Sequence, residues 1–186
     1  MASSAPRWGY HQLDPRWARR LVGLADLPPG ATVVDVGAGT GVICTPLLEA
    51  GARVIAVESH RARASQLRRR FGDRLIVVQV DAADLRLPRR PFHVVANPPF
   101  GIGVALLKRL LAPGSRLSSA HLVLPAHQVR RWAERRAPGA RRWEQSFDIG
   151  IGPRVDRRSF RPAPSRDARV LVIGRRGQGQ AGAPAR

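Results

Sequence analysis

The stretch that decides the fold is TVVDVGAGTG, residues 32–41. Its first five residues are rich in valine, which is typical of a buried strand, and glycines follow at every second position from Gly37 to Gly41. Glycine lets the backbone approach a ligand closely, and a helix starting there presents free N–H groups at its N-terminus. The stretch therefore predicts a strand, a ligand-binding turn and a helix over 41–50.

Outward from this stretch, short apolar strands alternate with helices. Strands are expected at 32–36, 53–58, 75–80, 93–96 and 121–124, with weaker candidates at 143–149 and 170–173. Helices are expected at 41–50, from a Ser59 cap to Phe71, at 101–111 and at 126–136. This alternation predicts an α/β fold in which helices cover both faces of a parallel sheet, of the doubly wound type.

Two acidic residues lie around the glycines where they suit a nucleoside cofactor. Glu58 ends the next strand, roughly 20 residues after Gly37, where a carboxylate accepts the ribose hydroxyls. Gly37, Gly39 and Gly41 read GxGxG and not GxGxxG, so they do not match the pyrophosphate spacing of a dinucleotide site. Asp35 precedes the first glycine and suits the cationic amino-acid end of S-adenosylmethionine, which the pattern predicts as the cofactor.

Asp81 and Ala82 follow the third expected strand. At the carboxyl end of a strand, Asp81 is placed to accept the amino hydrogens of the cofactor's adenine, with Ala82 beside it. The alternative is that Asp81 only caps a helix or turn. The position at the nucleoside-binding edge favours the cofactor contact.

The tetrapeptide Asn97-Pro98-Pro99-Phe100 predicts the methyl acceptor. An amino group conjugated to a ring is a poor nucleophile, because its lone pair is delocalised. The Asn97 side-chain oxygen and the Pro98 carbonyl can accept its two hydrogens, the prolines stiffen the loop, and Phe100 can stack on the ring. The target base would then be flipped out or single-stranded.

The charge predicts a polyanionic partner. The chain has 32 basic and 13 acidic residues, a net charge of +19. No helix pairs this charge with a broad apolar face, so nucleic acid is favoured over a membrane surface. Trp132 and Trp143 either stack on bases or pack in the core. The expected RNA-binding arginines are Arg130, Arg131, Arg135, Arg136, Arg141 and Arg142.

Other classes are excluded by what the 186 residues lack. No apolar run approaches the roughly 18 residues of a membrane-spanning helix, and no secretory signal begins the chain. Cys44 is the single cysteine, so neither a disulfide framework nor a cysteine-rich metal site is expected. His121 and His127 lack acidic neighbours at metal-binding spacing, so no metal is predicted. These absences favour a soluble, cytoplasmic protein.

Taken in order, the motifs resemble the ribosomal RNA adenine-N6 methyltransferase family, specifically its erythromycin-resistance (Erm) branch. The similarity runs from about residue 8 to 174. Residues 9–13 resemble the family's N-terminal element, and Asn97–Phe100 its catalytic motif, here in the NPPF form shared with DNA-adenine and protein-glutamine methyltransferases. Ser159-Phe160-Arg161-Pro162-Ala163-Pro164 resembles its late F-x-P-x-P element.

The resemblance implies a Rossmann-like class I methyltransferase with a mostly parallel seven-stranded sheet. It implies that His11, Leu13 and Asn97 also contact the cofactor and that Phe160 lies beside the target base. Residues 1–176 would form one domain, of which 1–30 close over the cofactor, and 177–186 a disordered tail. The family's helical C-terminal domain would be absent, and the protein a monomer.

The implied activity is methylation of an adenine N6 in 23S ribosomal RNA, with resistance to macrolide, lincosamide and streptogramin antibiotics. Three alternatives remain open from the sequence. DNA-adenine and protein-glutamine methylation fit NPPF, although the first usually needs a target-recognition domain and the second does not explain the charge. A noncatalytic RNA-binding assembly factor fits the charge but leaves the cofactor motif and Asn97 unexplained.

Overall fold

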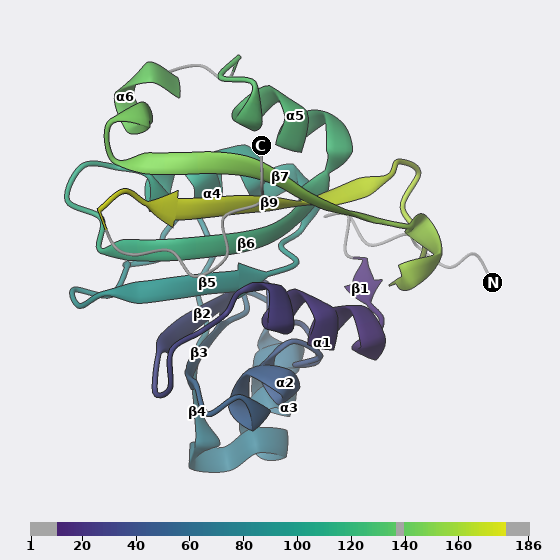
Figure 1. The fold of residues 1–186 in the computed structure, drawn as a ribbon. Helices are drawn as coiled ribbons and strands as arrows, with labels where there is room; N and C mark the ends of the chain where they lie inside the picture. Colours follow the sequence, from purple (N-terminus) through teal and green to yellow (C-terminus); the bar gives the residue numbers. More distant parts are fainter. Residues whose placement is uncertain (1–10, 137–139, 178–186) are drawn as a thin grey trace.

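The computed structural model describes residues 11–136 and 140–177. Seven strands form one sheet in the order β4-β3-β2-β5-β6-β9-β7 (Figure 1). Their bounds are β2 Thr32–Val36, β3 Arg53–Val57, β4 Leu75–Val78, β5 Phe92–Ala96, β6 Leu117–Pro125, β7 Phe147–Val155 and β9 Ala168–Arg175. Within this sheet β9 pairs antiparallel with both β6 and β7, while the other pairings are parallel. The prediction of a mostly parallel seven-stranded sheet is therefore confirmed.

Helices cover both faces of the sheet, as predicted. They are α1 Pro15–Leu24, α2 Cys44–Glu49, α3 Arg61–Phe71, α4 Gly103–Leu110, α5 Ala126–Ala133 and α6 Ala140–Glu144. Successive strand residues point to opposite faces. Val33 accordingly packs with the buried residues of α1, α2 and α3, and Val34 with those of α4 and α5. Two apolar cores therefore hold the sheet rigid from either side.

The amino-terminal helix α1 was missed by sequence reasoning. The sequence nevertheless contains the usual signals for the start of this helix, an N-cap residue and a proline in the first turn. The Asp14 side chain accepts a hydrogen bond from the Trp17 N–H, and Pro15 is the first helical residue. Leu21 and Val22 are buried on its inner face. The segment expected only to close over the cofactor thus contributes to the core.

Several expected bounds are corrected by the structure. The helix after the glycines begins at Cys44 and not at Gly41. His60, and not Ser59, is the N-cap residue of α3. Trp143 lies in α6, and the strand after it runs over Phe147–Val155, because the Trp143 ring stacks on Trp132 at 4.8 Å and is buried there. The short helices η1 Gly72–Arg74, η2 Phe100–Ile102 and η3 Arg157–Ser159 were not predicted.

A second, two-stranded sheet joins distant parts of the chain. The strand β1, Gln12–Leu13, pairs antiparallel with β8, Phe160–Arg161. The Asp14 N–H also donates to the Ser159 carbonyl at 2.8 Å. In Figure 1 this sheet lies at the right-hand side, where the parallel strands have their carboxyl ends. The N-terminal segment is therefore tied to the late motif at one edge of the main sheet.

No helix within the described ranges is long and apolar enough to cross a membrane. The predicted tail lies outside the described residues except for its first residue, Gly177.

Candidate active site

The candidate site lies at the carboxyl edge of the sheet, where β2 ends between β3 and β5. In α/β sheets, ligands bind at this kind of edge, where the strand order reverses. The turn after β2 is held by hydrogen bonds from the N–H groups of Gly37 and Ala38 to the Val57 carbonyl. Gly37, Gly39 and Gly41 all have positive φ values, 76°, 58° and 83°. Only glycine adopts such a conformation without strain, so the structure explains all three glycines.

The glycine turn touches the Asn97–Phe100 loop. A Cβ on Gly37 would lie 2.8 Å from Cδ of Pro99, which is closer than two carbons can pack. The predicted cofactor turn and the predicted catalytic loop are thus in direct contact through a residue without a side chain.

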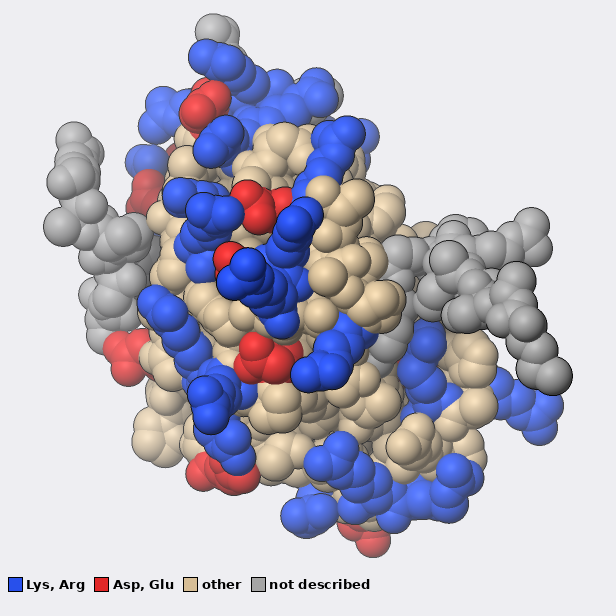
Figure 2. All heavy atoms as spheres, turned by 90° about the vertical axis from the view of Figure 1, so that its right-hand side faces the viewer, with Lys and Arg blue, Asp and Glu red and all other residues tan. Residues whose placement is uncertain are grey.

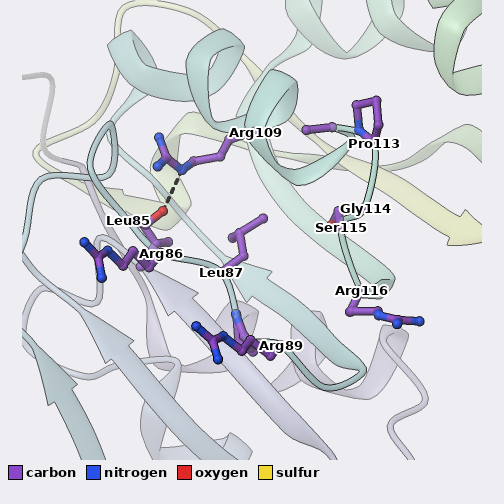
Figure 3. A pocket seen from close by; sticks show the side chains of 11 residues that line it. Leu85, Arg86, Leu87, Arg89, Arg109, Pro113, Gly114, Ser115 and Arg116 are labelled. Atoms are coloured by element: carbon purple, nitrogen blue, oxygen red, sulfur yellow. Dashed lines mark hydrogen bonds between the residues drawn. The ribbon is translucent and has the colours of Figure 1, made fainter.

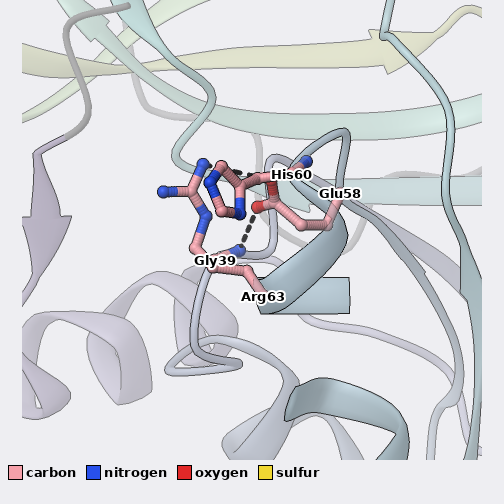
Figure 4. A network of polar contacts seen from close by, with 4 residues as sticks. All are labelled: Gly39, Glu58, His60 and Arg63. Carbon is pink, nitrogen blue, oxygen red and sulfur yellow. Dashed lines mark hydrogen bonds and ion pairs between the residues drawn. The ribbon is translucent and has the colours of Figure 1, made fainter. Parts of the chain in front are cut away.

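Glu58, predicted to bind ribose, is 3% exposed and directly follows β3. Its Oε2 accepts a hydrogen bond from the Gly39 N–H at 2.9 Å, and its Oε1 accepts one from the His60 N–H at 2.8 Å. Arg63 completes this network, with a guanidinium nitrogen 3.2 Å from Oε1 (Figure 4). The carboxylate is therefore aimed by the glycine turn, the start of α3 and one arginine.

Asp35 is buried within β2 at 1% exposure. Its Oδ2 accepts a hydrogen bond from the Cys44 thiol at 3.4 Å, while its Oδ1 has no partner among the described residues. Burial raises the pKa of Asp35 to about 7, the Cys44 hydrogen bond opposes this shift, and the nearby Glu58 charge adds to it. A cation placed at Oδ1 would therefore favour the ionised carboxylate.

Asp81 caps a turn in the structure, which is the role that the sequence left open as the alternative to binding the cofactor. It is exposed, three residues beyond the end of β4, and its Oδ1 accepts a hydrogen bond from the Ala83 N–H at 2.8 Å. Ala82 beside it is half-buried. Capping uses only one carboxylate oxygen, so the turn fixes Asp81 at the edge of the site and leaves Oδ2 for a ligand.

Asn97 follows β5 with its amide held in one orientation. Its Nδ2 donates to the His11 carbonyl at 2.7 Å, and its buried Oδ1 has no partner within residues 11–136 and 140–177. A buried acceptor without a donor is costly, which points to a ligand that donates to it. Pro98, the next residue, is buried.

Three rings lie beside Asn97. Phe100 is half-buried, with its ring centroid 5.4 Å from that of His11 and 6.2 Å from that of Phe160, edge to face. Phe160 is only 2% exposed. Phe100 is thus exposed enough to contact a base, whereas Phe160 contacts Phe100 edge to face and is too buried to stack on a base without moving. Leu13 is buried next to Phe160's strand.

The surface around this edge is basic. Figure 2 looks onto it and shows Lys and Arg side chains spread across the face, where they outnumber the Asp and Glu side chains that lie among them. Arg157 and Arg158 in η3 and Arg161 in β8 are exposed, and no described acidic side chain pairs with them. We call these three residues the edge cluster. They flank Phe160 on both sides along the chain.

The arginines predicted to bind RNA lie elsewhere. Arg130 and Arg131 are exposed in the last turn of α5, and Arg142 is exposed in α6. Arg135 is 3.7 Å from Glu144, and Arg136 is 3.5 Å from Glu134. In Figure 1, α6 lies at the side of the sheet opposite to β1. We call this predicted set the helix cluster; the side chain of its sixth member, Arg141, lies outside the described part of the chain.

Outside the site, the structure contains a surface cavity and a buried histidine. A cavity of about 530 Å³ opens at the amino ends of β5 and β6, lined by residues that include Arg86, Arg89 and Arg116 (Figure 3). No group of three or more metal-binding side chains occurs among the described residues. His121 is buried, and burial lowers its pKa to about 4.

Sequence reasoning missed the contact of Arg63 with Glu58, the contact of the His11 carbonyl with Asn97, and the position of the edge cluster. Arg63 belongs to an arginine-rich helix whose charges have the pattern of a solvated face. The other contacts come from the pairing of β1 with β8, between residues far apart in the chain. The one signal in the sequence that relates these two segments is the resemblance of both to motifs of the same family.

Comparisons with known proteins agree on one family. The model of the family described as "Ribosomal RNA adenine dimethylase" matches residues 10–181. An rRNA methyltransferase of Streptomyces thermotolerans is 35% identical over 173 residues, 88% of this chain and 56% of that protein. The mycinamicin-resistance protein MyrB of Micromonospora griseorubida is 35% identical over 77% of this chain and 47% of its own length. The chain thus spans about half the length of these curated relatives.

Solved structures show the same likeness. The 23S rRNA methyltransferase ErmE superposes with a TM-score of 0.80 and 25% identity, over 88% of this chain and 69% of that one. A dimethyladenosine transferase from Plasmodium falciparum has a TM-score of 0.78 at 21% identity, over 89% of this chain and 64% of that one, and supports the fold.

Proposed function

The chain belongs to the ribosomal RNA adenine dimethylase family, and we propose that it transfers methyl groups from S-adenosylmethionine to the N6 amino group of an adenine in 23S ribosomal RNA. The observation that carries this proposal is the buried, unpartnered Oδ1 of Asn97 beside the half-buried Phe100. An acceptor oxygen next to a ring suits an aromatic amine, because it can bind one N–H while the ring stacks on the base.

The residues present fit the proposed cofactor. A second unpartnered oxygen, the carboxylate Oδ1 of Asp35, suits the ammonium group of the cofactor's amino-acid end. The glycine turn admits a ligand against its backbone, Glu58 is aimed to accept ribose hydroxyls, and Asp81 and Ala82 lie where adenine would. The predicted contacts of His11 and Leu13 remain part of this proposal. A neighbour with 18% identity and a TM-score of 0.58 was solved with the same cofactor bound.

The chemistry then needs little from the protein beyond placement. When bound, the cofactor supplies an electrophilic methyl group on a sulfonium, which is an excellent leaving group. Asn97 Oδ1 and the Pro98 carbonyl accept the two N6 hydrogens, which draws the amine lone pair out of conjugation with the ring. With the base held in this way, N6 would take the methyl group as the sulfur–methyl bond broke, and the neutral sulfide would leave. N6 then loses its extra proton, which is acidic after transfer, to water.

Substrate binding is assigned to the basic surface of the same edge. The edge cluster is close in the chain to Phe160, and its guanidinium groups form no ion pair with described acidic side chains, although the Asp156 carboxylate caps η3 beside them. Phosphate contacts position nucleic acid, whereas base contacts specify it. We therefore propose that Arg157, Arg158 and Arg161 hold the RNA backbone while the small pocket at Asn97 selects adenine. The helix cluster, partly neutralised by Glu134 and Glu144, would contribute less.

The names of two relatives support the 23S target, whereas others are named ribosomal RNA small subunit methyltransferase A. ErmE is named as a 23S rRNA methyltransferase, and MyrB as a mycinamicin-resistance protein. We propose that the chain acts in the cytoplasm, that residues 1–176 work as one methyltransferase domain, and that methylation protects the ribosome against macrolide-type antibiotics.

The test is a methyl-transfer assay with four acceptors. Labelled S-adenosylmethionine is incubated with the protein and either 23S rRNA, 16S rRNA, duplex DNA or ribosomal protein. We expect label in 23S rRNA, recovered as N6-methylated adenine by mass spectrometry. Label found mainly in DNA or protein would contradict the proposal, and label in 16S rRNA alone would keep the chemistry but change the target.

A further inference from the structure

Arg63 lies over the carboxylate that the proposed cofactor needs. Its guanidinium nitrogen is 3.2 Å from Oε1 of Glu58, and the side chains of Arg63 and Glu58 are 30% and 3% exposed (Figure 4). Arg63 comes from the first turn of α3, whereas the Gly39 donor on the other carboxylate oxygen comes from the glycine turn. The Glu58 carboxylate is therefore bound from two sides by the protein itself.

The acceptor positions of this carboxylate are nearly all used. An ionised carboxylate has about four lone-pair positions, two on each oxygen. Oε1 accepts from His60 N–H and from Arg63, and Oε2 accepts from Gly39 N–H, so three positions are used. Two ribose hydroxyls donating to this carboxylate need two positions. One of the three present donors has to leave.

The two backbone donors are not able to leave without refolding the site. The Gly39 N–H is fixed in the turn whose N–H groups at Gly37 and Ala38 bond to Val57, and the His60 N–H is at the start of α3. Arg63 is different, because it reaches Glu58 through a long side chain that is 30% exposed, so this contact can break by side-chain rotation without a change in the backbone.

We propose that Arg63 is a latch on the ribose subsite, which closes the Glu58 carboxylate before the cofactor binds and is displaced when it binds. This inference rests on the proposed function, because it takes Glu58 as the ribose acceptor. Cofactor affinity is then the result of a competition between an intramolecular ion pair and two hydroxyl groups. Arg63 is a positioning residue that acts through Glu58 and weakens cofactor binding.

The experiment is calorimetry of S-adenosylhomocysteine binding to the full chain and to Arg63→Met. The variant keeps the length of the side chain and removes its charge. We expect it to bind about two- to fivefold more tightly, the effect of losing one partly exposed ion pair. Salt weakens such a pair, so parental affinity should rise with salt while that of the variant stays flatter.

Arg61→Met is the matched control. Arg61 is the first residue of α3, is exposed, and has no ion pair among the described residues. It changes the net charge by the same amount two residues away, so it should leave the affinity unchanged. Arg63→Gln serves as a second latch variant in case methionine disturbs the fold.

A second arm uses Glu58→Gln. Without the carboxylate charge, Arg63 has no ion pair to form at this position. Adding Arg63→Met to Glu58→Gln should therefore give no further gain in affinity for S-adenosylhomocysteine. Weaker binding in Arg63→Met, or a change equal to that of Arg61→Met, overturns the latch while the proposed cofactor stands. Absence of any binding in the parent overturns both, and is thereby distinct from failure of the latch alone.

Discussion

On the cofactor side of the site, three donors hold Glu58. On the acceptor side, Asn97 donates one hydrogen bond, to the His11 carbonyl, which orients its amide and leaves Oδ1 open. The cofactor side is built from local contacts among the glycine turn, β3 and α3. The acceptor side is built from segments around residues 11, 97 and 160, which only the folded chain brings together.

The difference indicates that the two sides bind their ligands in different ways. A side that already satisfies its own polar groups is preorganised, but a ligand has to displace something to bind there. On the other side, a buried acceptor without a donor carries an uncompensated desolvation cost. A ligand that donates to it removes this cost, so the interaction is made with the reacting group itself. Substitutions on the two sides should therefore have separable effects.

The largest effect is expected from Asn97→Ala. It removes the open acceptor and should lower the rate of methyl transfer by about a hundred- to a thousandfold, as when one polar group at a reacting centre is lost. Cofactor affinity, measured by calorimetry, should stay near the parental value. Turnover close to that of the parent would show that the acceptor site lies elsewhere.

Glu58→Ala should act on the other side alone. Losing hydrogen bonds to a charged acceptor costs about 1.5–3 kcal/mol, so S-adenosylmethionine and S-adenosylhomocysteine should both bind roughly ten- to a hundredfold more weakly. Glu49→Ala is the control, because Glu49 is exposed and its described ion pair is with Arg19. Equal affinity in Glu58→Ala and the parent would refute the ribose assignment.

Phe100→Leu and Phe160→Leu separate a stacking ring from a supporting ring. Phe100→Leu should weaken RNA binding by up to about 1–3 kcal/mol and barely change stability, because its ring is half-buried. Phe160→Leu should lower the free energy of unfolding by about 1 kcal/mol, because its ring is 2% exposed. Denaturant unfolding and a filter-binding assay distinguish the two. The opposite pattern would restore Phe160 as the stacking ring.

The two arginine clusters extend the contrast to the surface. Replacing Arg157, Arg158 and Arg161 by glutamine should reduce the salt slope of RNA binding by about 0.7 for each phosphate that the variant no longer binds. The matched control replaces Arg130, Arg131 and Arg142, which removes the same charge from the helix cluster. If the slope falls equally in both triple variants, net charge alone binds the RNA and the position of the edge cluster is irrelevant.

The last prediction concerns Asp35 and the pH dependence of stability. Its folded pKa of about 7 lies above the ordinary value of 3.8, so the native state holds this proton more tightly than the unfolded state. Its contribution to stability is therefore present at low pH and is lost as pH rises from about 4 through 7. Thermal unfolding across pH 4–8 should show that the stability of the parent falls relative to that of Asp35→Asn, because the opposite contribution of His121, whose pKa is lowered to about 4, is common to both proteins. An identical pH profile for the two would contradict it.

The local parts of the fold were predictable and the long-range parts were not. The strand at 32–36 agrees with β2 to the residue, because valines and a following glycine turn specify it locally. The place of Asn97 after β5 follows from the same kind of pattern. The sequence predicts a strand over 143–149, but Trp143 lies in α6, where its ring stacks on that of Trp132.

In the site, too, the residues set by local sequence were predictable and those set by long-range contacts were not. Glu58 and Asp35 could be named because each adjoins a strand and the glycine turn. The buried position of Phe160 depends on β8 pairing with β1, about 150 residues away in the chain, as the His11 contact to Pro162 also shows. Local periodicity carries no information on such a pairing, so only the resemblance to a family places the two motifs together.

The contact between Gly37 and Pro99 has a geometric consequence for the reaction. Methyl transfer requires donor and acceptor atoms to meet along one line at a short distance, and that distance is set where the two loops abut. With no Cβ on one side and a rigid ring on the other, the spacing has no rotatable bond with which to adjust. The contact acts as a mechanical stop, and even one added methyl group at Gly37 would push the reacting partners apart.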